Sequence, residues 1–274
     1  MIKFEHTVFA LPLAYVGAIM GAGGWPGMWN SGFILLAMVG ARSAAMSFNR
    51  LADHRYDSVN RRTRDRELPT GRLSRRSVLW FMTCSSLVFF ISAIALGRWC
   101  FYLSPPALII ILGYSYTKRF TWASHVFLGL ALSLAPVGGF LAVTGRIEWP
   151  VVIIATGVLF WVAGFDIIYA CQDEDFDQRM GLRSIPVELG ATRALRVSSL
   201  FHLASFFLFL IGGGLARLSW PYFVGALIVG LLLILEHLLV GPDRMERLDK
   251  AFFTINSYVS VTLLSGVIAA TILS

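Results

Sequence analysis

The stretch NRLADHRYD, residues 49–57, places oxygen-bearing side chains four residues apart at Asn49, Asp53 and Asp57. It directly follows a long apolar run, residues 32–46. A helix advances about 100° per residue, so residues four apart lie on one face. We therefore expect three oxygen ligands along one stripe at the end of a helix. Such a stripe suits a hard cation, or a cation that carries phosphate.

The composition around this stretch is that of an integral membrane protein. Of the 274 residues, 57% are hydrophobic and 14% are charged, and the mean hydropathy is +0.70. Soluble domains carry about 25% charged residues. We expect one all-helical membrane domain over residues 1–274. The three cysteines have neither disulfide nor metal spacing and are expected to be buried and inert. They are Cys84, Cys100 and Cys171.

Nine apolar segments are long enough to cross a bilayer, whose core of about 30 Å needs about 20 residues of helix. The expected spans are 7–24, 31–53, 77–97, 100–117, 122–144, 150–172, 194–216, 220–240 and 251–273. The first could imitate a signal peptide, but its removal would spoil the topology derived below. Gly17 and Gly21, within it, would permit close contact with another helix.

The basic residues fall very unevenly on the two sides that nine spans define. One side holds 18 of the 23, and three lie on the other. The 18 include Lys3, Arg61, Arg244 and Arg247. Basic loops stay cytoplasmic, which predicts a cytoplasmic N-terminus and an external C-terminus. Topology thus explains the net charge of +7 without a nucleic-acid partner.

A second polar cluster lies in DIIYACQDEDFDQRMGLRS, residues 166–184, at the exit of the sixth span. Asp173 and Asp177 are four residues apart, and Asp166 lies seven before Asp173. The second span repeats this spacing at an offset of 124 residues. The pairs are Arg42 with Asp166, Asn49 with Asp173, and Asp53 with Asp177.

Membrane proteins built from internal repeats often place their site between equivalent helices. We therefore expect the second and sixth spans to face each other, with the active site between them at the cytoplasmic side. A lone helix-end aspartate is more often simply solvated. Arg42 and Asp166, however, lie well inside apolar runs, where a charge costs about 2.5–3.5 kcal/mol and persists mainly when it pairs or functions.

Two clusters of oxygen ligands would repel each other without cations. Mg²⁺ prefers a few carboxylates together with water and substrate phosphates, and it stabilises a diphosphate as a leaving group. The predicted metal ligands are Asn49, Asp53, Asp57, Asp173 and Asp177. Further donors for a diphosphate are Arg66, Arg72, Lys118 and Arg119. For the loop arginines, the topology signal is the stronger explanation.

Four motifs together resemble the UbiA superfamily of intramembrane prenyltransferases. They are the NxxxDxxxD pattern of residues 49–57, ELPTGRLS, YSYTKRFT and YACQDEDFDQRMGLRS. The likeness covers nearly the whole chain and is strongest to the 4-hydroxybenzoate polyprenyltransferases of quinone biosynthesis. The opening IKFEHTVFALPLA resembles a branch in which some members serve menaquinone synthesis. A naphthoate-type acceptor is therefore an alternative to 4-hydroxybenzoate, the ubiquinone precursor.

The resemblance implies an Mg²⁺-dependent enzyme of the bacterial cytoplasmic (inner) membrane, in contact with lipid, that transfers a polyprenyl group from polyprenyl diphosphate to an aromatic acid. Asn49 would bind the diphosphate through Mg²⁺, and Lys118 and Arg119 would add positive charge as the C–O bond breaks. Aromatic faces can stabilise the resulting allylic cation. The candidates are Tyr114, Tyr116 and Tyr169, although membrane tyrosines are more often packing or interface residues.

Arg42 suits the carboxylate of the acceptor, because guanidinium offers a fork of donors. Asp166, at the equivalent depth, would hold or deprotonate the acceptor hydroxyl. The alternative is that these two residues form a buried pair without chemical use. The remaining polar residues show no such pattern. His125 and His202 occur singly, and Glu236 and His237 are expected at the interface.

A cation-coupled transporter is the alternative from another functional class. Transport carboxylates should lie near the membrane midplane. The aspartates of this chain instead cluster mostly at helix ends beside basic loops. This location favours the enzyme.

Overall fold

The computed structural model describes residues 5–60, 62–240 and 248–273, which form helices and connecting turns without a strand. Nine long helices occur in this part of the chain. They are α1 (Glu5–Ala22), α2 (Gly27–Ala52), α4 (Arg75–Leu96), α5 (Arg98–Thr117), α6 (Ser124–Thr144), α7 (Trp149–Ala170), α10 (Ala191–Leu215), α11 (Trp220–Leu239) and α12 (Leu248–Ile272). The short elements are α3 (His54–Asp57), the 3₁₀ turn η1 (Cys171–Asp173), α8 (Glu174–Arg179) and α9 (Ile185–Leu189).

The helices agree with the predicted spans to within a few residues, which confirms an all-helical, multi-pass membrane architecture. Among the described residues, eight segments are long and apolar enough to cross a bilayer, and α1 adds a shorter apolar stretch, Ala10–Ala22. The count of nine spans and the orientation stay predictions. Lys3, Arg61, Arg244 and Arg247, which the charge count uses, lie outside the described residues.

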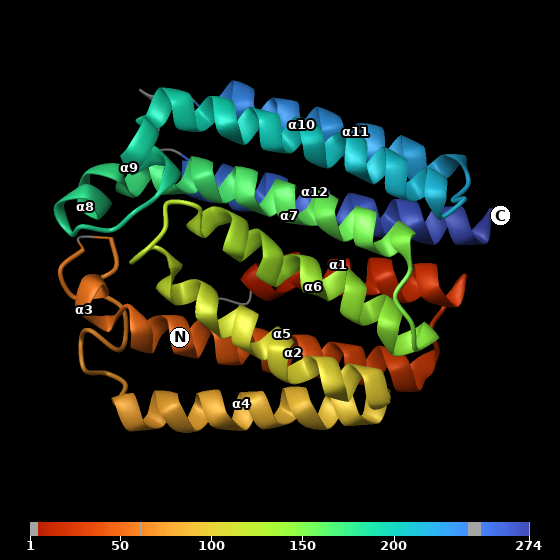
Figure 1. Cartoon of the computed structure of the whole chain (residues 1–274), viewed down its shortest axis with the longest axis horizontal. Helices are drawn as coiled ribbons and strands as arrows, with labels where there is room; N and C mark the ends of the chain where they lie inside the picture. The colour runs from red at the N-terminus through yellow and green to blue at the C-terminus, as the bar shows by residue number, and fades with distance from the viewer. Residues whose placement is uncertain (1–4, 61, 241–247, 274) are drawn as a thin grey trace.

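The long helices run roughly along one direction, and the short elements gather at one end (Figure 1). α4 packs on α2, α1 lies against α6 and α12, α7 packs between α6 and α10, and α11 packs on α12. The short α3 and the pair α8 and α9 lie together at the end where α2 and α7 finish (Figure 1). Both aspartate motifs are therefore at the same end of the bundle, as predicted.

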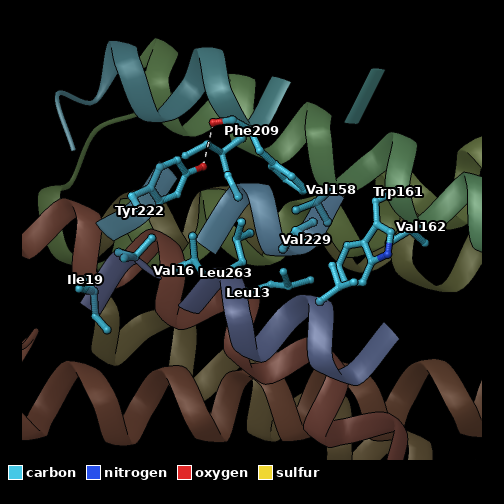
Figure 2. Packing of buried hydrophobic residues seen from close by; sticks show 14 of the residues in the cluster. Leu13, Val16, Ile19, Val158, Trp161, Val162, Phe209, Tyr222, Val229 and Leu263 are labelled. Atoms are coloured by element: carbon cyan, nitrogen blue, oxygen red, sulfur yellow. Dashed lines mark hydrogen bonds between the residues drawn. The ribbon is translucent and has the colours of Figure 1, made fainter. Parts of the chain in front are cut away.

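The main buried cluster joins α1 to the C-terminal helices (Figure 2). Leu13 of α1, Trp161 of α7 and Leu263 of α12 are essentially inaccessible. At one end of this cluster the Tyr222 hydroxyl donates a hydrogen bond of 2.9 Å to the Phe209 carbonyl (Figure 2). Lipid is as apolar as these side chains, so close packing and buried hydrogen bonds hold such helices together.

Glycines allow α1 and α6 to approach until their backbones touch. A Cβ atom at Gly17 would lie 1.8 Å from the Pro136 carbonyl oxygen, and one at Gly139 would lie 1.9 Å from the Ala14 oxygen. At Gly21 the nearest atom would be the Thr144 Cγ2, at 2.9 Å. The predicted close contact at Gly17 and Gly21 is confirmed, and α6 contributes its own glycine to it.

The cysteines differ in exposure. Cys171 is buried and Cys100 is half-buried, but Cys84 is exposed. The prediction of burial is wrong for Cys84, because α4 packs mainly on α2 and leaves its other face uncovered.

Candidate active site

The first aspartate motif lies at a break between α2 and α3. The predicted stripe is not one continuous helix: α2 ends at Ala52, Asp53 is its C-cap residue, and α3 begins at His54. Helix-type bonds still connect the motif, since Asp53 N donates to Asn49 O at 2.9 Å and Asp57 N donates to Asp53 O at 2.8 Å. The four-residue spacing therefore still places the three side chains together.

Hydrogen bonds order the side chains of this first cluster. The Asn49 amide nitrogen donates to Asp53 Oδ2 at 2.9 Å, which leaves the amide oxygen as the atom of Asn49 that a cation can use. Asp57 is buried, and the Arg66 Nη1 donates to both of its oxygens at 2.7 and 2.8 Å. Arg50 lies 3.8 Å from the same carboxylate.

The second aspartate motif follows α7 through a similar break. α7 ends at Ala170, the turn η1 ends at Asp173, and α8 carries Asp177. Asp173 forms an ion pair and hydrogen bond with Arg62, which comes from the loop after the first motif. Arg62 also bonds the Tyr169 hydroxyl and lies 4.7 Å from the centre of its ring. Arg62 thus connects the two motifs. The sequence did not predict this role, because it showed only that Arg62 is one of several arginines in a loop.

The end of α5 lies between the two motifs and pairs with both. Lys118 Nζ is 3.3 Å from Asp177 Oδ2 of the second motif. Arg119 is 3.5 Å from Asp53 Oδ1 of the first, and it donates to the Ala52 carbonyl at 2.6 Å, where a cation also complements the C-terminal end of the α2 dipole. Each of the four aspartates therefore pairs with a different basic side chain.

The electrostatics of the site reflect the burial of its charged groups. Burial raises the pKa of Asp53 to about 6, the Asp57 carboxylate adds to this rise, and Arg119 opposes it. Burial lowers the pKa of Lys118, but the carboxylates of Asp177 and its neighbours outweigh this effect and raise it. Lys118 is therefore held as a cation, and the buried position of Asp53 favours its neutral form.

The two motif-bearing helices do not pack along their lengths. α6 contacts both α2 and α7, whereas α2 and α7 share no extensive contact. The expectation of a directly facing helix pair is corrected in this respect. The reason is that α6 has small residues on its α1 side, so α1 and α6 take the central place. The two clusters meet through Arg62 and the end of α5 instead.

The deeper residues Arg42 and Asp166 do not form an ion pair with each other in the described part of the chain. Arg42 has a buried Nε without a hydrogen-bond partner, and it interacts electrostatically with the Tyr114 hydroxyl. Asp166 Oδ2 is 2.6 Å from His125 Nδ1. The alternative of a buried Arg42–Asp166 pair is therefore wrong, and the guanidinium is left with bonding capacity.

The tautomer of His125 follows from its second contact. The Ile185 backbone N–H points to His125 Nε2 at 3.4 Å. A backbone N–H can only donate, so Nε2 accepts and the proton lies on Nδ1, which donates to Asp166. His125 has an inaccessible side chain. Its role was missed in the sequence because its partner lies 41 residues away, at a spacing that no helix repeat reveals.

The three predicted tyrosines lie in different surroundings. Tyr114 interacts electrostatically with Arg42, Asp53 and Asp166, and so lies near the first motif and the two deeper residues. Tyr116 is 39% exposed, and its ring is 4.5 Å from the Arg119 guanidinium carbon. Tyr169 contacts Arg62 as described above.

Arg72 is the one predicted donor that the described structure does not bring to the clusters. It is exposed in the loop before α4, and no contact of its side chain with either cluster occurs there. Gly71, beside it, has a positive φ of 73°, which identifies the Pro69-Thr70-Gly71 segment as a tight turn. This turn directs the loop toward α4.

Comparison with known proteins decides the family. The model of the UbiA prenyltransferase family matches residues 10–258. The chain belongs to the UbiA prenyltransferase family. Among related proteins, one from Nitrosospira multiformis is 32% identical and matches 89% of this chain and 88% of its own length. One from Methylobacillus flagellatus is 29% identical and matches 88% of this chain and 82% of its own length. Both bear the name 4-hydroxybenzoate octaprenyltransferase.

Solved structures support the UbiA fold of this chain. The apo structure of a UbiA homolog from Aeropyrum pernix K1 superposes with a TM-score of 0.89 at 33% identity, covering 98% of this chain and 99% of that one. A UbiA homolog from Archaeoglobus fulgidus, bound to GPP and Mg²⁺, superposes with a TM-score of 0.74 at 20% identity, covering 97% and 96%. The second likeness concerns the fold alone. The transporter hypothesis receives no support from these comparisons.

Proposed function

We propose that this chain transfers a polyprenyl group from polyprenyl diphosphate to an aromatic acid, with 4-hydroxybenzoate as the preferred acceptor. The observation that carries the proposal is the end of α5, where Lys118 faces one aspartate motif and Arg119 faces the other. A diphosphate placed between the motifs would be within reach of both bases. Relatives named 4-hydroxybenzoate octaprenyltransferase support the acceptor.

The chemistry of the donor set fits Mg²⁺. The candidate ligand atoms are carboxylate and amide oxygens, which Mg²⁺ prefers. Burial, with the neighbouring Asp57 carboxylate, raises the pKa of Asp53 to about 6, and a divalent cation beside it would favour the ionised carboxylate. The residues that would hold it are Asn49, Asp53, Asp57, Asp173 and Asp177. When bound, Mg²⁺ neutralises diphosphate oxygens and makes the diphosphate a better leaving group.

Lys118 and Arg119 can bind either the aspartates or a diphosphate. Lys118 and Arg119 pair with aspartates in the structure, and the same side chains can turn to diphosphate oxygens. As the bond between prenyl C1 and its oxygen breaks, the electron pair goes to the diphosphate. Their positive charge then stabilises the negative charge that develops there. Tyr114 lies near Asp53 and Asp166 and would face the allylic cation.

The acceptor would lie deeper, beside Arg42 and Asp166. Arg42 is seven residues before Asn49, which is about 10 Å along a helix, and its guanidinium would bind the acceptor carboxylate. Asp166 keeps one oxygen on His125 and would use the other to accept the hydrogen bond of the phenol. This orients the ring carbon beside the hydroxyl toward prenyl C1. That carbon forms the new bond and then loses its proton to the released diphosphate.

The proposed setting is the bacterial cytoplasmic membrane, where the prenyl tail would lie among apolar helices and lipid, and the proposed pathway is ubiquinone synthesis. A naphthoate acceptor, as in menaquinone synthesis, would place the same carboxylate on Arg42. Because both acids fit that contact, the choice rests on the names of the relatives.

Purified protein in lipid nanodiscs tests the proposal. It is incubated with Mg²⁺, labelled prenyl diphosphates and a panel containing 4-hydroxybenzoate, a hydroxynaphthoate and phenol. We expect prenylated 4-hydroxybenzoate together with equimolar diphosphate, and loss of both products in Asp53→Asn and Asp177→Asn. Absence of diphosphate release with every acceptor, together with cation flux in liposomes, would refute the proposal.

A further inference from the structure

The connection between α8 and α9, together with the first residue of α9, is buried over residues 182–185. Leu182 is 9% exposed, Ser184 is inaccessible and Ile185 is 1% exposed. Connecting segments usually run over the surface, because backbone N–H and C=O groups need partners when they are buried. The partners of the N–H groups in this segment therefore indicate what its burial contributes.

Two adjacent N–H groups of the segment bind the backbone on both sides of one ion pair. The Leu182 N–H donates to the Asp177 carbonyl oxygen at 2.9 Å, and the Arg183 N–H donates to the Lys118 carbonyl oxygen at 2.7 Å. The side chains of Asp177 and Lys118 pair with each other at 3.3 Å. The segment therefore fixes the two points of the backbone from which this ion pair extends.

A third N–H group of the segment acts on the acceptor side of the proposed site. The Ile185 N–H donates to His125 Nε2 at 3.4 Å, and His125 Nδ1 is 2.6 Å from Asp166 Oδ2. A backbone N–H can only donate, so His125 accepts at Nε2 and presents its proton to Asp166 at Nδ1. Ile185 thus orients the ring that in turn orients Asp166.

The segment is itself held by contacts that lie outside the site. Ser184 has an extended backbone, with φ −154° and ψ 164°, and its side chain caps the N-terminus of α9. The Ile185 side chain belongs to a buried cluster that also contains Ile167 of α7 and Ala194 of α10. Capping and packing thus fix the segment from its other side, so that its N–H groups have defined positions.

We propose that residues 182–185 are a positioning segment for the prenyl transfer, which sets Lys118 toward the diphosphate and Asp166 toward the acceptor. The inference rests on the proposed function and adds residues that touch neither substrate. The Arg183 N–H holds the end of α5 beside the second aspartate motif. The Ile185 N–H holds the His125 ring against Asp166.

The segment connects two parts of the site that have to act in one geometry. Prenyl C1 and the acceptor carbon must approach each other closely, and a misplacement of about 1 Å can cost about 100-fold in rate. Lys118 directly follows α5 and His125 lies in the first turn of α6, with a turn of the chain between them. The segment spans this turn with N–H groups that are two residues apart. It therefore fixes the diphosphate side of the site relative to the acceptor side.

Replacement of a single backbone amide by an ester tests the segment, because it removes one N–H donor. The full-length chain is made by cell-free synthesis into nanodiscs, with an α-hydroxy acid introduced at one position by nonsense suppression. At position 185 the α-hydroxy analogue of isoleucine is compared with the unmodified chain. At position 183 the α-hydroxy analogue of leucine is compared with Arg183→Leu, which keeps the amide. The matched control is an ester at Ala194, a buried position whose N–H donates to the Gly190 carbonyl at 3.0 Å.

Each ester should affect one substrate and not the other. The ester at position 183 should raise the KM for prenyl diphosphate and weaken the binding of inorganic diphosphate in Mg²⁺, each about two- to tenfold. The ester at position 185 should lower kcat/KM for 4-hydroxybenzoate by a similar factor and shift the nitrogen NMR signal of His125 Nε2, which His125→Asn identifies. The ester at position 194 should lower Tm and leave both substrates' kinetic constants unchanged.

Two outcomes would overturn the proposal. The first is a loss of transfer that is the same for both substrates in both esters, or that the ester at position 194 reproduces, because such a loss reflects stability of the fold. The second is diphosphate binding and a His125 signal that the esters leave unchanged. These last two measurements need no prenyl transfer. If the unmodified chain prenylates no acceptor, the proposed function fails, and diphosphate binding and the His125 signal still decide whether the segment positions these groups.

Discussion

Replacement of Arg42 tests the deepest part of the proposed site. Its Nε is buried without a hydrogen-bond partner, and Asp166 is held by His125 instead. The Arg42 guanidinium thus keeps hydrogen-bonding capacity that the protein does not use, and it is available to bind a carboxylate. A hydrogen bond to a charged group contributes about 1.5–3 kcal/mol. Since each 1.36 kcal/mol is tenfold, Arg42→Ala should lower kcat/KM for a carboxylated acceptor about 10- to 150-fold.

The assay compares two acceptors on two enzymes. Initial rates of prenylation are measured for 4-hydroxybenzoate and for phenol, which lacks the carboxylate, at saturating prenyl diphosphate and Mg²⁺. The loss should be confined to 4-hydroxybenzoate and should arise mainly in its KM, while the KM for prenyl diphosphate changes little. Arg42→Lys keeps the charge but loses the planar fork, so it should recover only part of the activity.

The comparison also defines what would refute the assignment. If Arg42→Ala lowers the rates with 4-hydroxybenzoate and phenol by the same factor, the arginine acts on a step common to both. Equal rises in the KM values for acceptor and prenyl diphosphate would likewise contradict a role of Arg42 in binding the acceptor carboxylate. Thermal unfolding of the variant shows whether such a common loss reflects the fold.

Three further predictions follow from contacts in the structure. His125→Asn keeps a hydrogen-bond donor near Asp166, whereas His125→Gln does not. The Gln variant should therefore lose about tenfold more kcat than the Asn variant. Equal losses of kcat in the two variants would contradict the role of the His125 ring as a donor that orients Asp166. Arg62→Ala removes a partly exposed ion pair in which the arginine competes with a cation for the Asp173 carboxylate. Titration should therefore show Mg²⁺ binding tightened by no more than about fivefold. Weaker Mg²⁺ binding in the variant would contradict this competition. Gly139→Ala should lower Tm, because its Cβ would lie 1.9 Å from an α1 carbonyl oxygen. Gly138→Ala is the control and should leave Tm unchanged, because no atom would lie within 4 Å of its Cβ. Equal Tm values for the two variants would contradict the backbone contact between α1 and α6.

The sequence predicted the helices well because their signal is local. Each span is a run of apolar residues long enough to cross a bilayer, and the basic residues beside it lie in short loops. The helix bounds agree with this reading to within a few residues. The breaks after Ala52 and Ala170 were not predicted, because a four-residue repeat continues through a C-cap residue that keeps nearly helical hydrogen bonds.

The contacts between distant residues were beyond the reach of spacing arguments. Lys118 and Arg119 were predicted to act at the site, but not that each serves a different aspartate motif. His125 looked like an isolated polar residue because Asp166 lies on another helix. Glu236 looked interfacial because it is near a helix end, yet neighbouring helices enclose it. Burial of this kind depends on which helices pack together, and hydropathy does not encode that choice.

Each of the four motif aspartates pairs with its own basic side chain, and this arrangement affects how the proposed site would fill. A diphosphate alone would draw Lys118 and Arg119 away from Asp177 and Asp53 and would leave these carboxylates exposed to one another. A divalent cation alone would displace the same bases and leave them unpaired. When both enter together, the cation takes the carboxylates and the diphosphate takes the bases, so every charge keeps a partner. Because unpaired charges in a partly buried site are costly, the two ligands should bind cooperatively, with the end of α5 as the element that couples them.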